Sequence, residues 1–119
     1  MTTDVDNSAS ANVDVNKLQA ALFAVHDQLQ SKFNATTDPD MSEAILTEMQ
    51  EVMHRIVLLQ RQIFVGQSSK LSNLADQVDG VNQTLQQSLQ TINQITDLVK
   101  AVANFLTLVD KAIDFAKTL

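Results

Sequence analysis

An unbroken heptad pattern in the C-terminal half of the chain constrains the fold more than any other feature. Apolar residues recur there at alternating spacings of three and four, and twelve of the fourteen positions hold Val, Ile or Leu. The positions are Leu71, Leu74, Val78, Val81, Leu85, Ser88, Ile92, Ile95, Val99, Val102, Leu106, Val109, Ile113 and Ala116. Heptads sustained beyond three or four repeats are typical of helices that pack as coiled coils. Because the phase also passes unchanged through Gly80, we expect one long helix over residues 69–117.

Two shorter helices are predicted before it. Apolar residues at spacings of three and four predict a helix over residues 17–34, with Asn16 as its N-cap. A second helix is expected over 39–65, because Asp38 can cap it and Pro39 suits the first helical position. Gly66 follows, where we expect the left-handed conformation that ends many helices.

The composition fits a single all-α domain. The 119 residues include only two Gly and one Pro, too few for the many turns of a β-sandwich or barrel. Cys is absent from the sequence, which excludes disulfides and thiolate metal sites. Residues 1–15 carry three Asp and no basic residue, so they are predicted to be a disordered acidic tail. Residues 16–119 are then one helical domain.

The predicted helix lengths leave half of the long helix without a neighbour. It would be roughly 70 Å long, whereas the helix before it would be about 40 Å. The resulting three-helix, coiled-coil-like fold is a helical hairpin that covers only the first half of the long helix. Beyond Asp97, extra apolar residues such as Phe105 and Leu108 widen the apolar face. A surface this broad requires a partner from outside the chain.

A four-helix up-down bundle is the alternative fold. Thr96 and Asp97 could cap a new helix, and a turn near Asp97 would fold the C-terminal segment back onto the chain. However, no Gly or Pro lies near Asp97, and the heptad phase continues from Ile95 to Val99. These two observations favour the continuous helix.

The unpartnered surface predicts a non-enzymatic scaffold or interaction protein. It would self-assemble as a homo-oligomer, or dock on a larger protein, through the C-terminal half of the long helix. The predicted interface consists of Leu98, Val99, Val102, Phe105, Leu106, Leu108, Val109, Ala112, Ile113, Phe115 and Leu119. The alternative is a membrane-active or secreted protein, such as a toxin or secretion accessory, that uses residues 98–119. Lys and Asp residues offset one another in that segment, so an anionic bilayer would not attract it.

No residue pattern points to catalysis, a metal or a cofactor. The pair Glu51 and His54 has the E-x-x-H spacing of di-metal helical bundles. Those sites need two such pairs, and the heptad phase places His54 on the outer face. His26, the other histidine, lies beside the predicted core. The chain also lacks a Gly-rich phosphate loop, because Gly66 and Gly80 stand alone.

Charge and targeting signals limit the remaining classes. The net charge is -6 and basic residues are scattered singly, which disfavours nucleic-acid binding. The first fifteen residues lack the basic start and apolar run of a secretory signal. No uncharged apolar segment is long enough for a transmembrane helix. We therefore expect a soluble protein that is cytoplasmic, or exported by a route without a cleaved signal peptide.

Overall fold

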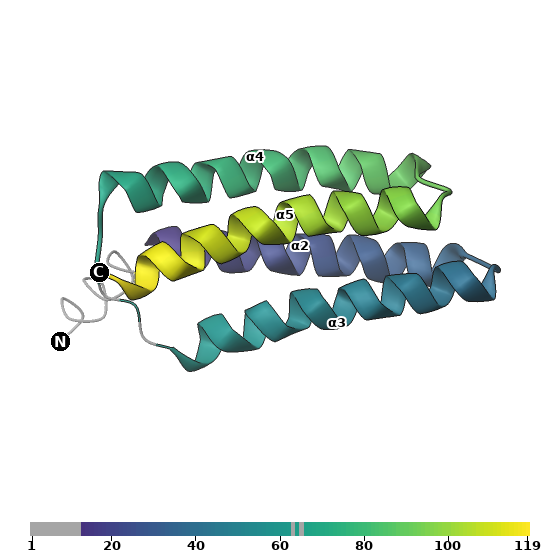
Figure 1. Ribbon diagram of the computed structural model, residues 1–119, viewed down its shortest axis with the longest axis horizontal. Coiled ribbons are helices and arrows are strands. Elements are labelled where there is room, and N and C mark those ends of the chain that lie inside the picture. Colours follow the sequence, from purple (N-terminus) through teal and green to yellow (C-terminus); the bar gives the residue numbers. More distant parts are fainter. Residues whose placement is uncertain (1–12, 63, 65) are drawn as a thin grey trace, which may run out of the picture.

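Two helical hairpins make up the computed structural model, which describes residues 13–62, 64 and 66–119 (Figure 1). The first hairpin consists of α2 (Val13–Ala35) and α3 (Pro39–Arg61), and the second of α4 (Ser69–Thr91) and α5 (Ile95–Lys117). Each helix has 23 residues, and the bundle measures 52 × 26 × 20 Å. The prediction of an all-α fold is confirmed.

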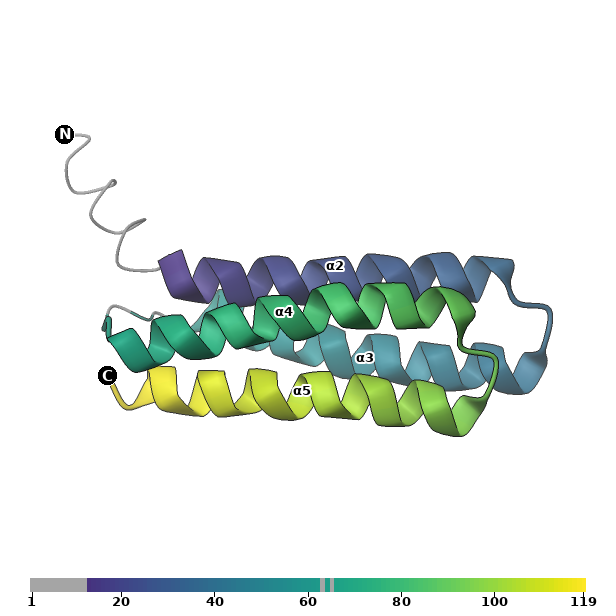
Figure 2. The same cartoon turned by 90° about the horizontal axis from the view of Figure 1, so that it is seen from above.

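The hairpins lie side by side with α2 parallel to α4 and α3 parallel to α5 (Figure 2). Both α2 and α5 contact α3 and α4, so the order around the bundle is α2, α3, α5, α4. Helices α3 and α4 therefore lie across a diagonal of the bundle, and the end of α3 and the start of α4 are opposite the two short turns. Phe64, between α3 and α4 in the sequence, is buried with the core residues of the helices.

The starts of α3 and α4 agree with the capping residues in the sequence. The Asp38 carboxylate accepts a hydrogen bond of 3.0 Å from the Asp40 backbone N–H, and Pro39 is the first helical residue. The Ser68 hydroxyl accepts one of 3.1 Å from the Leu71 backbone N–H. Each cap satisfies a backbone donor that has no partner within its own helix.

The expectation of one helix over residues 69–117 is wrong. Helix α4 ends at Thr91, and α5 begins at Ile95 after a turn with extended backbone at Ile92 and Gln94. The fold is therefore the four-helix alternative, with its turn just before Asp97. Two physical reasons favour the turn. Thr91, Ile92 and Asn93 are weak helix formers, and folding back buries the broad apolar face of α5 within its own chain.

Gly80, by contrast, lies inside α4, as its heptad phase predicts.

Other helix boundaries differ from the predicted ones by a few residues. Val13–Val15, which we assigned to the tail, belong to α2, and Val15 is buried. Asn16 is therefore not an N-cap, and the rest of the predicted tail, residues 1–12, lies outside the described residues. Helix α3 ends at Arg61, before the expected residue 65.

Gly66 does not have the expected left-handed backbone, since no described glycine has a positive φ. Glycine is required at position 66 because there is no room for a side chain. A Cβ at Gly66 would collide with the Cβ of Leu119 and approach the Leu119 carbonyl carbon to 3.0 Å. Leu119 therefore lies directly against Gly66, between the two hairpins.

Candidate interaction surface

Most of the predicted interface is buried inside the bundle. Leu98, Val102, Phe105, Leu106, Val109, Ala112 and Ile113 all belong to the core. Leu108 and Phe115 are half-buried, whereas Val99 and Leu119 are 41% and 43% exposed. Since α3 and α4 cover the heptad face of α5, the premise that this helix lacks a neighbour within the chain is wrong.

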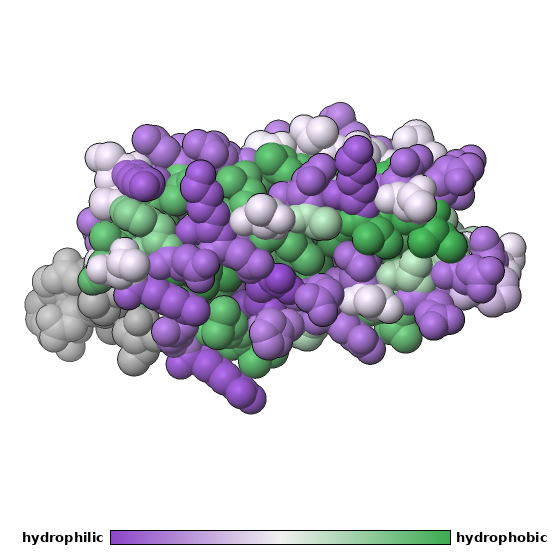
Figure 3. Space-filling view, viewed as in Figure 1, coloured by the Kyte–Doolittle hydropathy of each residue, from purple (hydrophilic) through white to green (hydrophobic). Residues whose placement is uncertain are grey.

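A line of half-buried apolar side chains remains on the outer side of α5. Ala101, Leu108 and Phe115 are spaced by seven residues, so they lie in a row along the helix. Lys70 of α4 places its Nζ 4.9 Å from the centre of the Phe115 ring, a cation–π distance. This contact locates the row beside α4, and we call Ala101, Leu108 and Phe115 the α5 strip. Figure 3 shows hydrophobic surface where α4 and α5 lie side by side, interrupted by hydrophilic side chains.

A second row, of polar residues, adjoins the α5 strip. Asp97, Asn104 and Lys111 are exposed and are again spaced by seven residues. An acid therefore lies at one end of the row, a base at the other and a neutral amide between them. The sequence interpretation missed this row because it looked for partners only on the apolar face. The sequence does contain the evidence for this row, because the three residues occupy the same outer heptad position of α5.

The α4 side of this surface is also uncharged over most of its length. No Asp, Glu, Lys or Arg occurs in residues 80–96. Gln77 and Thr84 are exposed polar residues of α4, and Val81 is half-buried. The outer face of the α4–α5 hairpin thus combines apolar and neutral polar side chains, with charges concentrated toward its two ends.

Ion pairs between helices occur instead on the seams that join the two hairpins. Arg55 of α3 pairs with Asp110 of α5 at 2.9 Å, and Lys17 of α2 pairs with Asp76 of α4 at 2.6 Å. Among the described residues, these are the two ion pairs that connect different helices. Both pairs therefore bridge the two hairpins, and none of the ion pairs among the described residues crosses the α4–α5 face.

One acidic residue is buried near the α3–α5 seam. Glu48 is 8% exposed, and burial raises the pKa of its carboxyl. The negative charge of Glu51 adds to this shift in pKa, and the positive charge of Arg55 opposes it. Because a buried carboxyl resists ionisation, the Glu48 carboxylate lowers the stability of the folded protein at neutral pH.

The histidines do not form a metal site. His54 is exposed, as the heptad phase predicts, and His26 is half-buried. Among the described residues, no three His, Cys, Asp or Glu side chains are grouped so that they could hold a metal ion.

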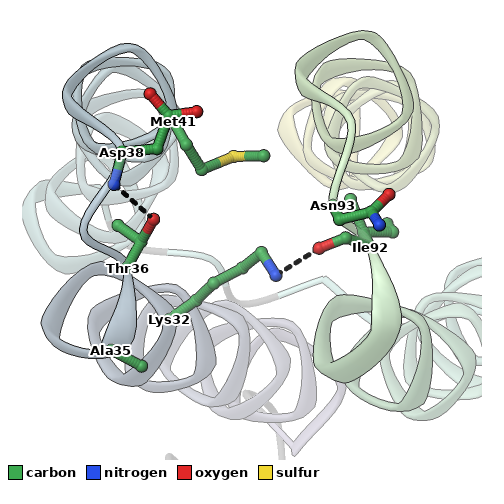
Figure 4. A pocket seen from close by; sticks show the side chains of 7 residues that line it. All are labelled: Lys32, Ala35, Thr36, Asp38, Met41, Ile92 and Asn93. Carbon is green, nitrogen blue, oxygen red and sulfur yellow. Dashed lines mark hydrogen bonds between the residues drawn. The ribbon is translucent and has the colours of Figure 1, made fainter.

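A cavity of about 320 Å³ lies between the two turns at one end of the bundle (Figure 4). It is lined by Lys32, Ala35, Thr36, Asp38, Met41, Ile92 and Asn93. The Lys32 ammonium donates hydrogen bonds to the backbone oxygens of Leu89, at 2.9 Å, and Ile92, at 2.5 Å. Those carbonyls belong to the end of α4, where a positive charge is favourable. Asp38 likewise caps the start of α3, so both charged residues of the cavity cap helix ends.

Comparison with known proteins gives no match to a family model, to a curated protein or to a solved structure. Within the part of the chain that the structure describes, none of the helices is long and apolar enough to cross a membrane.

Proposed function

We propose that this protein is a non-enzymatic helical scaffold that self-assembles through the outer face of its α4–α5 hairpin. The observation that carries the proposal is the α5 strip, an apolar row that lies between neutral polar residues of α4 and the row of Asp97, Asn104 and Lys111, in which one acid and one base balance. Two copies with a net charge of -6 repel each other. A face without an excess of negative charge is where that repulsion opposes contact least, and apolar side chains provide the gain from leaving water.

The proposal moves the predicted interface to another side of the same helix. Seven residues of the predicted interface are among the eight buried residues of α5 and already stabilise the bundle, so a partner could reach them only if the core opened. Leu108 and Phe115 are members of the predicted interface that the bundle leaves partly accessible. They are the residues on which self-assembly through this face depends.

Static light scattering on the full chain at micromolar concentrations tests this function. We expect a mass above the 13.1 kDa of one chain. Leu108→Glu should return the protein to the monomer, because it buries a charge in the contact. Leu46→Glu is the matched control, since Leu46 is a 45% exposed leucine on α3, and it should leave the mass unchanged. A wild-type monomer at every concentration would contradict the proposal.

A membrane-active protein is the second candidate. One observation favours it: the broad apolar face of α5 is sheltered in the bundle, as a segment that later enters a bilayer must be. Release of an encapsulated dye from phosphatidylcholine vesicles at micromolar protein would support this function. Intact vesicles after prolonged incubation would exclude it.

A further inference from the structure

We infer that the self-assembled form is a twofold-symmetric dimer in which the α5 helices of two copies lie antiparallel, outer face to outer face. This inference rests on the proposed self-assembly and adds the partner and its orientation. The partner is a second copy of this chain, and the contact centres on Asn104. Charge placement along α5 and the shape of the α5 strip are the two arguments for it.

Opposite charges on the α5 helices of two copies face each other only when the helices are antiparallel. Asp97 precedes Asn104 by seven residues and Lys111 follows it by seven, so each lies about 10 Å from Asn104 along the helix. A twofold axis through Asn104 places Asp97 of one copy opposite Lys111 of the other, and symmetry repeats the pair. A parallel arrangement would oppose like charges at both ends, which disfavours it.

The apolar row fits the same arrangement. Leu108 lies four residues after Asn104 and Ala101 lies three before it. The antiparallel pairing therefore brings the large side chain of Leu108 close to the small Ala101 of the second copy. Both residues are half-buried in the single chain, so the contact would complete the burial of surface that the bundle leaves accessible.

The surrounding surface does not oppose this contact. On α4, Gln77 and Thr84 are uncharged and exposed, so they can lie at the rim of the dimer, and Lys70 is already in contact with the Phe115 ring of its own chain. The ion pairs of the bundle lie on the seams between hairpins and stay intact. The dimer thus needs no change in the fold of either copy.

Charge reversal tests the orientation, with the dimer dissociation constant measured by sedimentation. Asp97→Lys and Lys111→Asp should each weaken the dimer roughly tenfold, because each change creates two like-charge contacts. The double substitution should return the dissociation constant to within about threefold of the wild-type value. Asp27→Lys, the same change on the exposed face of α2, is the control and should not weaken the dimer.

A cysteine at the axis provides an independent test. Because the sequence contains no Cys, Asn104→Cys introduces the only thiol, and under oxidation it should form a disulfide between copies. Asp27→Cys should not. The proposed orientation would be wrong if charge reversal left the dissociation constant of the dimer unchanged, or if the thiol at residue 104 formed no disulfide. Either result would leave the proposed scaffold function in place. A protein that stays monomeric at all concentrations would overturn both.

Discussion

Arg55 of α3 and Asp110 of α5 are joined by two hydrogen bonds of 2.9 Å, from Nε to Oδ1 and from Nη2 to Oδ2. The same guanidinium donates through Nη1 to the side chain and backbone oxygens of Glu51. Its side chain is only 16% exposed, so this paired geometry is held in a partly dry seam. The pair therefore links the second hairpin to the first along the α3–α5 seam.

Asp110→Asn should lower the free energy of unfolding by about 1 kcal/mol, since it removes a charge-assisted pair from the α3–α5 seam. Urea unfolding followed by circular dichroism measures the change. Asp114→Asn is the control, because the side chain of Asp114 is 77% exposed and lies 4.0 Å from its partner Lys117. Equal effects of the two substitutions would mean that the Arg55 pair does not stabilise the seam.

Glu48→Gln should stabilise the protein at pH 7 and reduce its dependence on pH. The folded protein holds the Glu48 proton more tightly than the unfolded chain does, because burial raises its pKa. The destabilisation is therefore complete above the raised pKa and disappears below the ordinary pKa of Glu. Urea midpoints should separate the variant from wild type at pH 7 and bring the two together near pH 4. A separation that is no larger at pH 7 than at pH 4 would contradict this explanation.

Gly80→Ala should stabilise the protein by about 0.5–1 kcal/mol, because alanine favours the helix and restricts the unfolded chain. Nothing lies within 4 Å of the position that the new Cβ would occupy. Gly66→Ala should destabilise the protein, since its Cβ would collide with Leu119. Thermal unfolding of the two variants should show melting temperatures that move in opposite directions.

Ile95→Pro distinguishes the turn at residues 92–94 from a continuous helix. Proline suits the first position of α5, and Gln94 before it already has the extended backbone that proline requires, with φ -112 and ψ 132. We expect a loss below about 1 kcal/mol in urea unfolding, because only part of the Ile95 side chain is buried. Thr84→Pro, inside α4, should cost about 3 kcal/mol or more. A comparable loss for Ile95→Pro would indicate one helix across the turn.

Lys32→Met should destabilise the end of the bundle that contains the two turns. It removes the hydrogen bonds to Leu89 and Ile92, and bonds to a charged group contribute about 1.5–3 kcal/mol. Hydrogen exchange should quicken in the last turn of α4 more than at its first turn. Lys17→Met, which removes an exposed pair with Asp76, should leave exchange at the end of α4 unchanged.

The parts of the fold that depend on neighbouring residues could be predicted from the sequence. Asp38, Pro39 and Ser68 act on the backbone two or three residues away, so they identify the starts of α3 and α4 directly. The core faces of the helices follow from the same local periodicity. Helix ends are less well specified, as α3 shows by stopping at Arg61.

The turn at residues 92–94 could not be predicted from heptad phase. Helices α4 and α5 each turn an apolar face toward the core, so a short turn between them can leave the spacing of apolar residues unchanged. Lys32 helps to end α4, because its ammonium donates a hydrogen bond to the backbone oxygen of Ile92, 60 residues away in the sequence. The sequence spacing places Asp97, Asn104 and Lys111 in one row, but only the fold shows that this row borders the accessible part of α5.

The meeting of Leu119 with Gly66 has a consequence for chain connectivity. Val13, at the start of the described chain, borders the same shallow hollow as Ser68 and Ser69, so both ends of the described bundle lie beside residues 66–69. A gene that encodes the second hairpin first, joined to the other by a flexible linker, would keep every helix in its place. We therefore expect a circular permutant with the two hairpins in the opposite order to keep the four-helix architecture.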